Sequence, residues 1–316
     1  MIAIGVINII TIPLISKLGN GSDQQGYLLV AILYGIIFAL CHIFCFAKTK
    51  EAVTVPEKKK IPIKLQIKTV AQNKPYLLAL IGQFLFGVTL YGRNADALYY
   101  FKYVEGSETL FTTYSLVIII PSIIGAGLFQ ILFKLTENKG RTASILAFCT
   151  GVSMLSLYLF SPVESAVAFY IFSGLTQFFF AGFNTAIYAI IPDCVEYGEW
   201  KTGIRNDGFQ YAFISLGNKI GMAIGTSVLA AALSCAGFEE NIKQNEAVLY
   251  IMKHSFSTIP GVLWIITAVV LFFYRLNKKS YNKIVDEIKE RKAKMFDIAA
   301  LGEILIDFTM QGFNTQ

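Results

Sequence analysis

The stretch GFQYAFISLGNKIGMAIGTSVLAAALSCA, residues 208–236, is mostly apolar and contains a single charged side chain, Lys219. A helix needs about 20 apolar residues to cross the roughly 30 Å hydrocarbon core of a bilayer, and this stretch is longer than that. It therefore predicts a membrane-spanning helix. Lys219 lies about eleven residues into the stretch, so we expect it near the middle of the bilayer.

Further apolar stretches along the chain qualify, or nearly qualify, as membrane-spanning helices. The 316-residue chain is 55% hydrophobic and only 15% charged, with a mean hydropathy of +0.57, which excludes an ordinary water-soluble domain. We predict an all-α membrane protein with about eight transmembrane helices, the first being too short to span comfortably. The other seven stretches are residues 1–16, 26–47, 76–101, 111–133, 142–160, 166–191 and 256–274.

The positive charge of the chain fits membrane loops better than a nucleic-acid partner. Although the net charge is +6, most of the 27 Lys and Arg residues lie in short blocks in alternate connections between apolar stretches. Positively charged loops stay in the cytoplasm, so this pattern predicts a multi-pass protein with a cytoplasmic C-terminus and no nucleic-acid partner. The five cysteines lie in or beside apolar stretches without metal-site spacing, and we predict no metal site and no cofactor.

The charged segment 48–75 separates two predicted helices in residues 1–47 from six in residues 76–275. We predict that it is a cytoplasmic inter-domain loop, with a short surface helix near its end because apolar residues recur there at helical spacing. Residues 276–294 show the same spacing and predict an amphipathic cytoplasmic helix. Its charged face is either simply solvated or binds a partner.

Three charged residues lie inside predicted spans, where each must be paired, face a cavity or serve a function. Lys219 points about 200° away from the helix face that carries three glycines, which favours a cavity, although pairing with a buried carboxylate is the alternative. Arg93 and Asp96 are three residues apart on one helix. They are candidates for either a structural ion pair or a substrate site.

Four uncharged polar or aromatic residues are further candidates for contact with a sugar. Tyr99 and Tyr100 suit sugar stacking, but they also suit an interfacial aromatic belt. Gln177 and Asn184 can hydrogen-bond sugar hydroxyls, but such residues also join neighbouring helices to one another.

The stretch PDCVEYGEWKTGIRNDG, residues 192–208, is unusually dense in mixed charge. We predict a cytoplasmic loop whose salt bridges with the opposite half form and break when a transporter rocks. The candidate gating residues are Asp193, Glu196, Tyr197, Glu199, Lys201 and Arg205.

This stretch, followed by GNKIGMAIG, resembles the glycoside–pentoside–hexuronide:cation symporters, the melibiose-permease-like branch of the major facilitator superfamily. RNADALYYFKYV and TIPLISKLGNGSDQQGYLL are similar to the same family. The resemblance implies a bacterial inner-membrane carrier, not an enzyme, with twelve helices in two halves, a sugar bound between them, and alternating access driven by Na⁺ or H⁺. Lys219 then matches the family's lysine on the eleventh helix, near the sugar. Asn184 falls near a position that is aromatic in melibiose permease.

On that alignment residues 1–47 correspond to the family's fifth and sixth helices, and residues 76–275 to the complete C-terminal half. The first four helices, which carry the family's acidic cation-binding residues, have no counterpart in the sequence. We therefore expect an incomplete carrier, and a non-transporting sensor or inactive remnant is an alternative.

The last segment has a second resemblance. MFDIAALGEILIDFT, residues 295–309, is similar to the opening strand of ribokinase-like sugar kinases, especially fructokinases, in which the Asp matching Asp307 contacts substrate. The resemblance implies that residues 295–316 are a kinase fragment without activity, joined to the transporter. It also implies sucrose or another fructoside as the transported sugar. A membrane-linked sugar kinase is the competing interpretation.

Overall fold

The computed structural model describes residues 10–11, 13–15, 17–20, 22–49, 61–160 and 165–294, and these form helices and connections without a strand. Seven of the described helices are long and apolar enough to cross a membrane, which confirms the predicted all-α membrane bundle. These helices span Gln24–Lys48, Lys74–Val104, Thr109–Thr136, Lys139–Leu159, Ala166–Thr202, Asp207–Cys235 and Glu246–Phe272.

The chain divides into two compact units, residues 1–61 and 62–316. In the first unit α2 (Asp23–Lys48) exposes most of its apolar side chains, as a helix in contact with lipid does. The helix predicted over residues 1–16 lies largely outside the described residues, as does the kinase-like segment 295–316, so both stay predictions.

The second unit begins with α3 (Ile63–Gln72), which confirms the helix predicted near the end of the inter-domain segment. It is followed by α4 (Lys74–Tyr99), which continues as a π-helical turn, η1 (Tyr100–Val104). The Asn73 side chain accepts a hydrogen bond from the backbone N–H of Tyr76 and so caps the start of α4.

The span predicted over residues 111–133 is built from two helices, α5 (Glu108–Val117) and α6 (Ile119–Thr136). The break follows from Pro121, which has no N–H to donate to the carbonyl one turn before it. After α6 the chain turns through Glu137, which has a left-handed backbone (φ 49°), and α7 (Lys139–Ser156) follows, extended by the 3₁₀ turn η2 (Leu157–Leu159).

The prediction of a loop over residues 192–208 is wrong for most of its length. α8 runs from Ala166 to Thr202 with Pro192 inside it, and only Gly203–Asn206 separate it from α9 (Asp207–Cys235). The charged segment stays helical because its buried residues keep a helical period and its charges have partners, so burial offsets the cost of the proline.

The last span also begins earlier than residue 256. It consists of α10 (Glu246–Lys253), the π-helical turn η3 (His254–Thr258) and α11 (Ile259–Phe272). A separate helix over residues 278–294 confirms the predicted amphipathic helix, and its buried Ile284 and Ile288 belong to the main hydrophobic core. Its apolar face therefore packs on the bundle.

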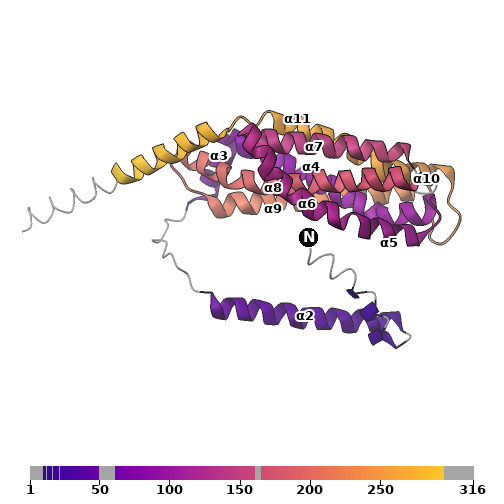
Figure 1. Cartoon of the computed structure of the whole chain (residues 1–316). Coiled ribbons are helices and arrows are strands. Elements are labelled where there is room, and N and C mark those ends of the chain that lie inside the picture. The colour runs from indigo at the N-terminus through magenta and orange to yellow at the C-terminus, as the bar shows by residue number, and fades with distance from the viewer. Residues whose placement is uncertain are drawn as a thin grey trace, which may run out of the picture. The chain divides into compact units, whose positions relative to one another are not determined.

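In the second unit the long helices run side by side as a bundle (Figure 1). α4 packs along α9, α7 packs against both α8 and α11, and α6 packs against α8. The α4–α9 contact is a glycine seam: a Cβ atom at Gly221 or Gly225 would collide with the carbonyl oxygen of Phe84 or Val88. Small residues thus let the two helix backbones approach closely.

Candidate functional site

Lys219 lies on the face of α9 opposite the glycine seam. Gly221 and Gly225 are buried against α4, whereas Lys219 is exposed. This confirms the direction predicted from 100° per residue. Its side chain forms no hydrogen bond or ion pair with any residue that the structure describes, so the pairing with a buried carboxylate is not formed there.

The surroundings of Lys219 on α9 leave room for a ligand. Ala212, Ser215 and Ala223 share its helix face, and all three are small and exposed. An ammonium group in the middle of a long apolar helix, flanked by small side chains, is an expensive arrangement unless water or a polar ligand reaches it.

Gln177 and Asn184 lie on α8, seven residues apart and hence on nearly the same face. Both are partly exposed, and neither side chain makes a hydrogen bond within the described residues. Their amide groups are therefore open to a ligand, although no hydrogen bond connects them to Lys219.

Arg93 and Asp96 do not form the ion pair that was one of the two predicted alternatives. Arg93 is buried on α4, and its Nε donates to the carbonyl oxygen of Phe256 at 2.9 Å, while Nη1 donates to the Tyr114 hydroxyl at 2.8 Å. Its guanidinium also lies 4.3 Å from the centre of the Phe256 ring. In a regular α-helix the Phe256 carbonyl would accept from the residue four positions later, but this is Pro260, which has no N–H.

The Asp96 side chain is fully buried, and neither of its carboxylate oxygens has a hydrogen-bond partner among the described residues. Arg93 therefore anchors α4 to α5 and η3, and Asp96 is left without a bonded partner there. A role for either residue in substrate binding stays a prediction.

The two candidate tyrosines, Tyr99 at the end of α4 and Tyr100 at the start of η1, differ in exposure. Tyr100 is only 3% exposed, stacks on the Phe256 ring at 4.2 Å, and donates to Glu105 at 2.6 Å. Tyr99 is half-buried and packs edge-on against Phe238. The structure thus places Tyr100 inside an aromatic cluster, and of the two tyrosines only Tyr99 is partly exposed.

Near the C-terminal end of α8, the predicted gating charges have partners within the same unit. Lys139 at the start of α7 pairs with Asp193 at 2.7 Å and also donates to the carbonyl oxygen of Ala189. Glu199 accepts from Arg205 at 2.8 Å and from Lys292 at 2.6 Å. We call the residues Lys139, Asp193, Glu199, Arg205 and Lys292 the α8 clamp.

The remaining members of the predicted set extend this network. Lys201 donates to the carbonyl oxygen of Gln72, and its ammonium lies 5.9 Å from the ring centre of Tyr197. Glu196 lies beside Tyr281, whose pKa is raised by burial and by this carboxylate. These contacts connect α8 to α3 and to the helix of residues 278–294.

Sequence reasoning missed the partners that come from far along the chain. Trp200 donates its ring N–H to Glu287 at 2.6 Å, and Arg291 donates to the carbonyl oxygen of Trp200. Lys292 and Lys139 were likewise not singled out. Only the amphipathic spacing of residues 276–294 could have indicated that this helix packs on the bundle; no local signal pairs residues about 90 positions apart.

A family model described as MFS/sugar transport protein matches residues 1–278. The chain is 28% identical over 288 residues to the isoprimeverose transporter of Lactiplantibacillus pentosus, covering 89% of this chain and 59% of that protein. It is 28% identical over 273 residues to the glucuronide carrier protein homolog of Escherichia coli strain K12, covering 83% of this chain and 57% of that protein.

A putative sulfoquinovose importer of Escherichia coli strain K12 is 29% identical over 287 residues, covering 90% of this chain and 60% of that protein. The chain thus spans about three fifths of the length of these curated relatives, which are named as transporters and not as enzymes. Because the family match covers most of the sequence, the chain belongs to the MFS/sugar transport family, in its glycoside–pentoside–hexuronide symporter-like branch, and is a multi-pass membrane protein.

Proposed function

We propose that this chain is the C-terminal part of a secondary active transporter that carries a sugar or glycoside by cation symport with alternating access. The observation that carries the proposal is Lys219, exposed and unpaired among the described residues in the middle of α9, on the face opposite the glycine seam. A cation held in that position is costly in lipid and useful in a polar pathway.

The chemistry of the exposed side chains suits a sugar. The ammonium of Lys219 offers three donors to hydroxyl or carboxylate oxygens, and the amides of Gln177 and Asn184 offer both donors and acceptors. Asp96, whose carboxylate has no bonded partner among the described residues, is the candidate in this half for responding to the coupling Na⁺ or H⁺. The remaining cation ligands would belong to the part of the relatives that this chain does not cover.

We place the end of the bundle that carries Lys139, Arg205 and the helix of residues 278–294 in the cytoplasm of a bacterial inner membrane. The support is the concentration of Lys and Arg in the connections at this end. In this orientation the α8 clamp is cytoplasmic. Because its charges pair within one unit, we propose that it keeps this half rigid while the two halves rock against each other.

The test is uptake by proteoliposomes that contain the full-length protein. Lys219→Ala should abolish cation-dependent uptake. The elution volume in size-exclusion chromatography and the helix content should stay unchanged, because the side chain forms no hydrogen bond or ion pair with a described residue. Lys134→Ala is the matched control, since Lys134 is also exposed and lies at the end of α6. Wild-type uptake by the Lys219 variant would refute the proposed site, and uptake without cation dependence would refute symport.

The substrate class can be tested in the same vesicles. The named relatives suggest a neutral disaccharide, a glucuronide and a sulfonated sugar as the first panel. Sucrose belongs in the panel because the kinase-like segment 295–316 predicts a fructoside. Uptake of the glucuronide alone would support pairing of an anionic sugar with Lys219. Uptake of sucrose alone would support a fructoside as the substrate.

A further inference from the structure

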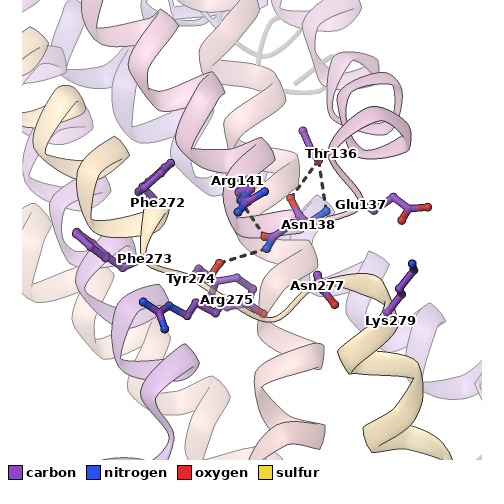
Figure 2. Close-up of a pocket in the computed structure, with 10 residues that line it drawn as sticks. All are labelled: Thr136, Glu137, Asn138, Arg141, Phe272, Phe273, Tyr274, Arg275, Asn277 and Lys279. Atoms are coloured by element: carbon purple, nitrogen blue, oxygen red, sulfur yellow. Dashed lines mark hydrogen bonds between the residues drawn. The ribbon is translucent and has the colours of Figure 1, made fainter.

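A cavity of about 570 Å³ lies at the end of the bundle that carries the α8 clamp. The turn between α6 and α7, the end of α11 and the connection to the helix of residues 278–294 surround it (Figure 2). We propose that this cavity binds the phosphate headgroup of an anionic phospholipid. This site is distinct from the Lys219 face and does not depend on the sugar that is carried.

The lining of the cavity carries an excess of positive charge. Arg141, Arg275 and Lys279 line it, whereas Glu137 is the one carboxylate among the lining residues that the structure describes. All three cationic side chains are exposed, and none forms an ion pair with a residue that the structure describes. They come from three different segments: α7, the connection after α11, and the helix of residues 278–294. A single anion bound among them would therefore neutralise charges that have no other described partner.

The backbone around the cavity is already held in place by its own hydrogen bonds. Asn138 accepts from the backbone N–H of Arg141 and donates to the carbonyl oxygen of Tyr274 at 3.3 Å, as the dashed lines in Figure 2 show. The backbone N–H of Lys278 donates to the carbonyl oxygen of Glu137 at 2.9 Å. Arg and Lys side chains only donate hydrogen bonds. A ligand bound among Arg141, Arg275 and Lys279 should therefore be rich in hydrogen-bond acceptors, as a phosphate is.

An adjoining apolar surface favours a lipid over a free phosphate. Phe272 and Phe273 line the cavity on the side away from Glu137 and Lys279, and they are 62% and 57% exposed. The paired helices α7 and α11 continue this surface with exposed apolar side chains along the span. Those side chains are Ile145, Phe148, Val152, Val262, Ile266 and Val269. Acyl chains would lie on this surface while the phosphate occupies the cationic cavity.

The test measures lipid binding by the full chain, purified in a neutral detergent, using native mass spectrometry with phosphatidylglycerol and phosphatidylcholine. We expect phosphatidylglycerol to bind more tightly. Replacing Arg141, Arg275 and Lys279 together by Gln should weaken its binding about a hundredfold, at roughly fivefold for each charge. The matched control replaces Lys64, Lys68 and Lys134, which are exposed basic residues outside the cavity, and should weaken binding less than about fivefold.

Equal binding of the two lipids would overturn the proposal in favour of apolar contact alone, and equal loss in the control and the cavity variant would overturn it in favour of general electrostatic attraction to the surface. Displacement of phosphatidylglycerol by millimolar inorganic phosphate would overturn it in favour of a free-phosphate site. Should the triple variant misfold, Lys279→Gln replaces it, since this exposed side chain makes no described hydrogen bond. The single variant should bind about fivefold more weakly, and unchanged binding would overturn the proposal.

Discussion

Removing Lys139 should destabilise the bundle strongly, because it leaves the carboxylate of Asp193 buried without its cation. The two side chains are 2.7 Å apart, with exposures of 23% for Lys139 and 5% for Asp193. At that distance, with an effective dielectric constant of about 20, the gross attraction is about 6 kcal/mol, and desolvation of both ions offsets part of it. Breaking a buried pair costs about 3–5 kcal/mol, and the partial exposure of Lys139 favours the lower end.

The assay is thermal unfolding in detergent, followed by the fluorescence of Trp200 and Trp264. A loss of about 3 kcal/mol corresponds to a fall of roughly 6–12 °C in Tm for Lys139→Met, at about 2–4 °C for each kcal/mol. The double variant Lys139→Met with Asp193→Leu removes both charges and should recover most of the loss. Lys134→Met is the control, because Lys134 is exposed and forms no ion pair with a described residue.

Two results would refute this reasoning. An unchanged Tm in Lys139→Met would mean that water solvates the Asp193 carboxylate well enough without its partner. A double variant whose loss equals the sum of the two single losses would mean that the two side chains are not energetically coupled.

Gly221→Val should force α4 and α9 apart and lower stability by about 1–3 kcal/mol or more, whereas Gly127→Val, with open space around it, should leave Tm unchanged. Trp200→Phe removes the 2.6 Å hydrogen bond to Glu287, so trypsin should cleave the helix of residues 278–294 several-fold faster; an unchanged rate would contradict this role. Because burial raises the pKa of Tyr281, the unfolded chain loses this proton first, and stability should fall as pH rises above about 10. Tyr281→Phe should show a smaller fall, and an equal fall would exclude this residue as its cause.

The spans could be predicted from the sequence because lipid imposes one simple requirement on every membrane helix, a sufficiently long apolar run. That requirement correctly placed the helices now called α2, α4, α7 and α9 to within a few residues. It failed for the end of α8, where charge density suggested a loop. The charges there are held by side chains from other helices, and a local pattern does not show such partners.

For the candidate site, the direction in which Lys219 points was predictable from the sequence, but the hydrogen bonds of Arg93 were not. The orientation of Lys219 follows from helical geometry alone, and the structure confirms it. The bonding of Arg93 was not predictable, because its acceptor is the carbonyl oxygen of Phe256, which lies 163 residues away along the chain. Spacing along one helix suggested Asp96 as the partner of Arg93, but Arg93 donates instead to Phe256 and Tyr114 on other helices.

The 37 residues of α8 have a mechanical consequence. At about 1.5 Å per residue the helix is about 55 Å long, which exceeds the roughly 40–45 Å thickness of a bilayer with its headgroups. Its final turns therefore extend beyond the membrane, and the helix of residues 278–294 packs against them. A tilt of about 10° at mid-membrane would move a helix tip about 25 Å away by roughly 4 Å, so a small rotation of this helix becomes a displacement of several ångströms at the end of the bundle.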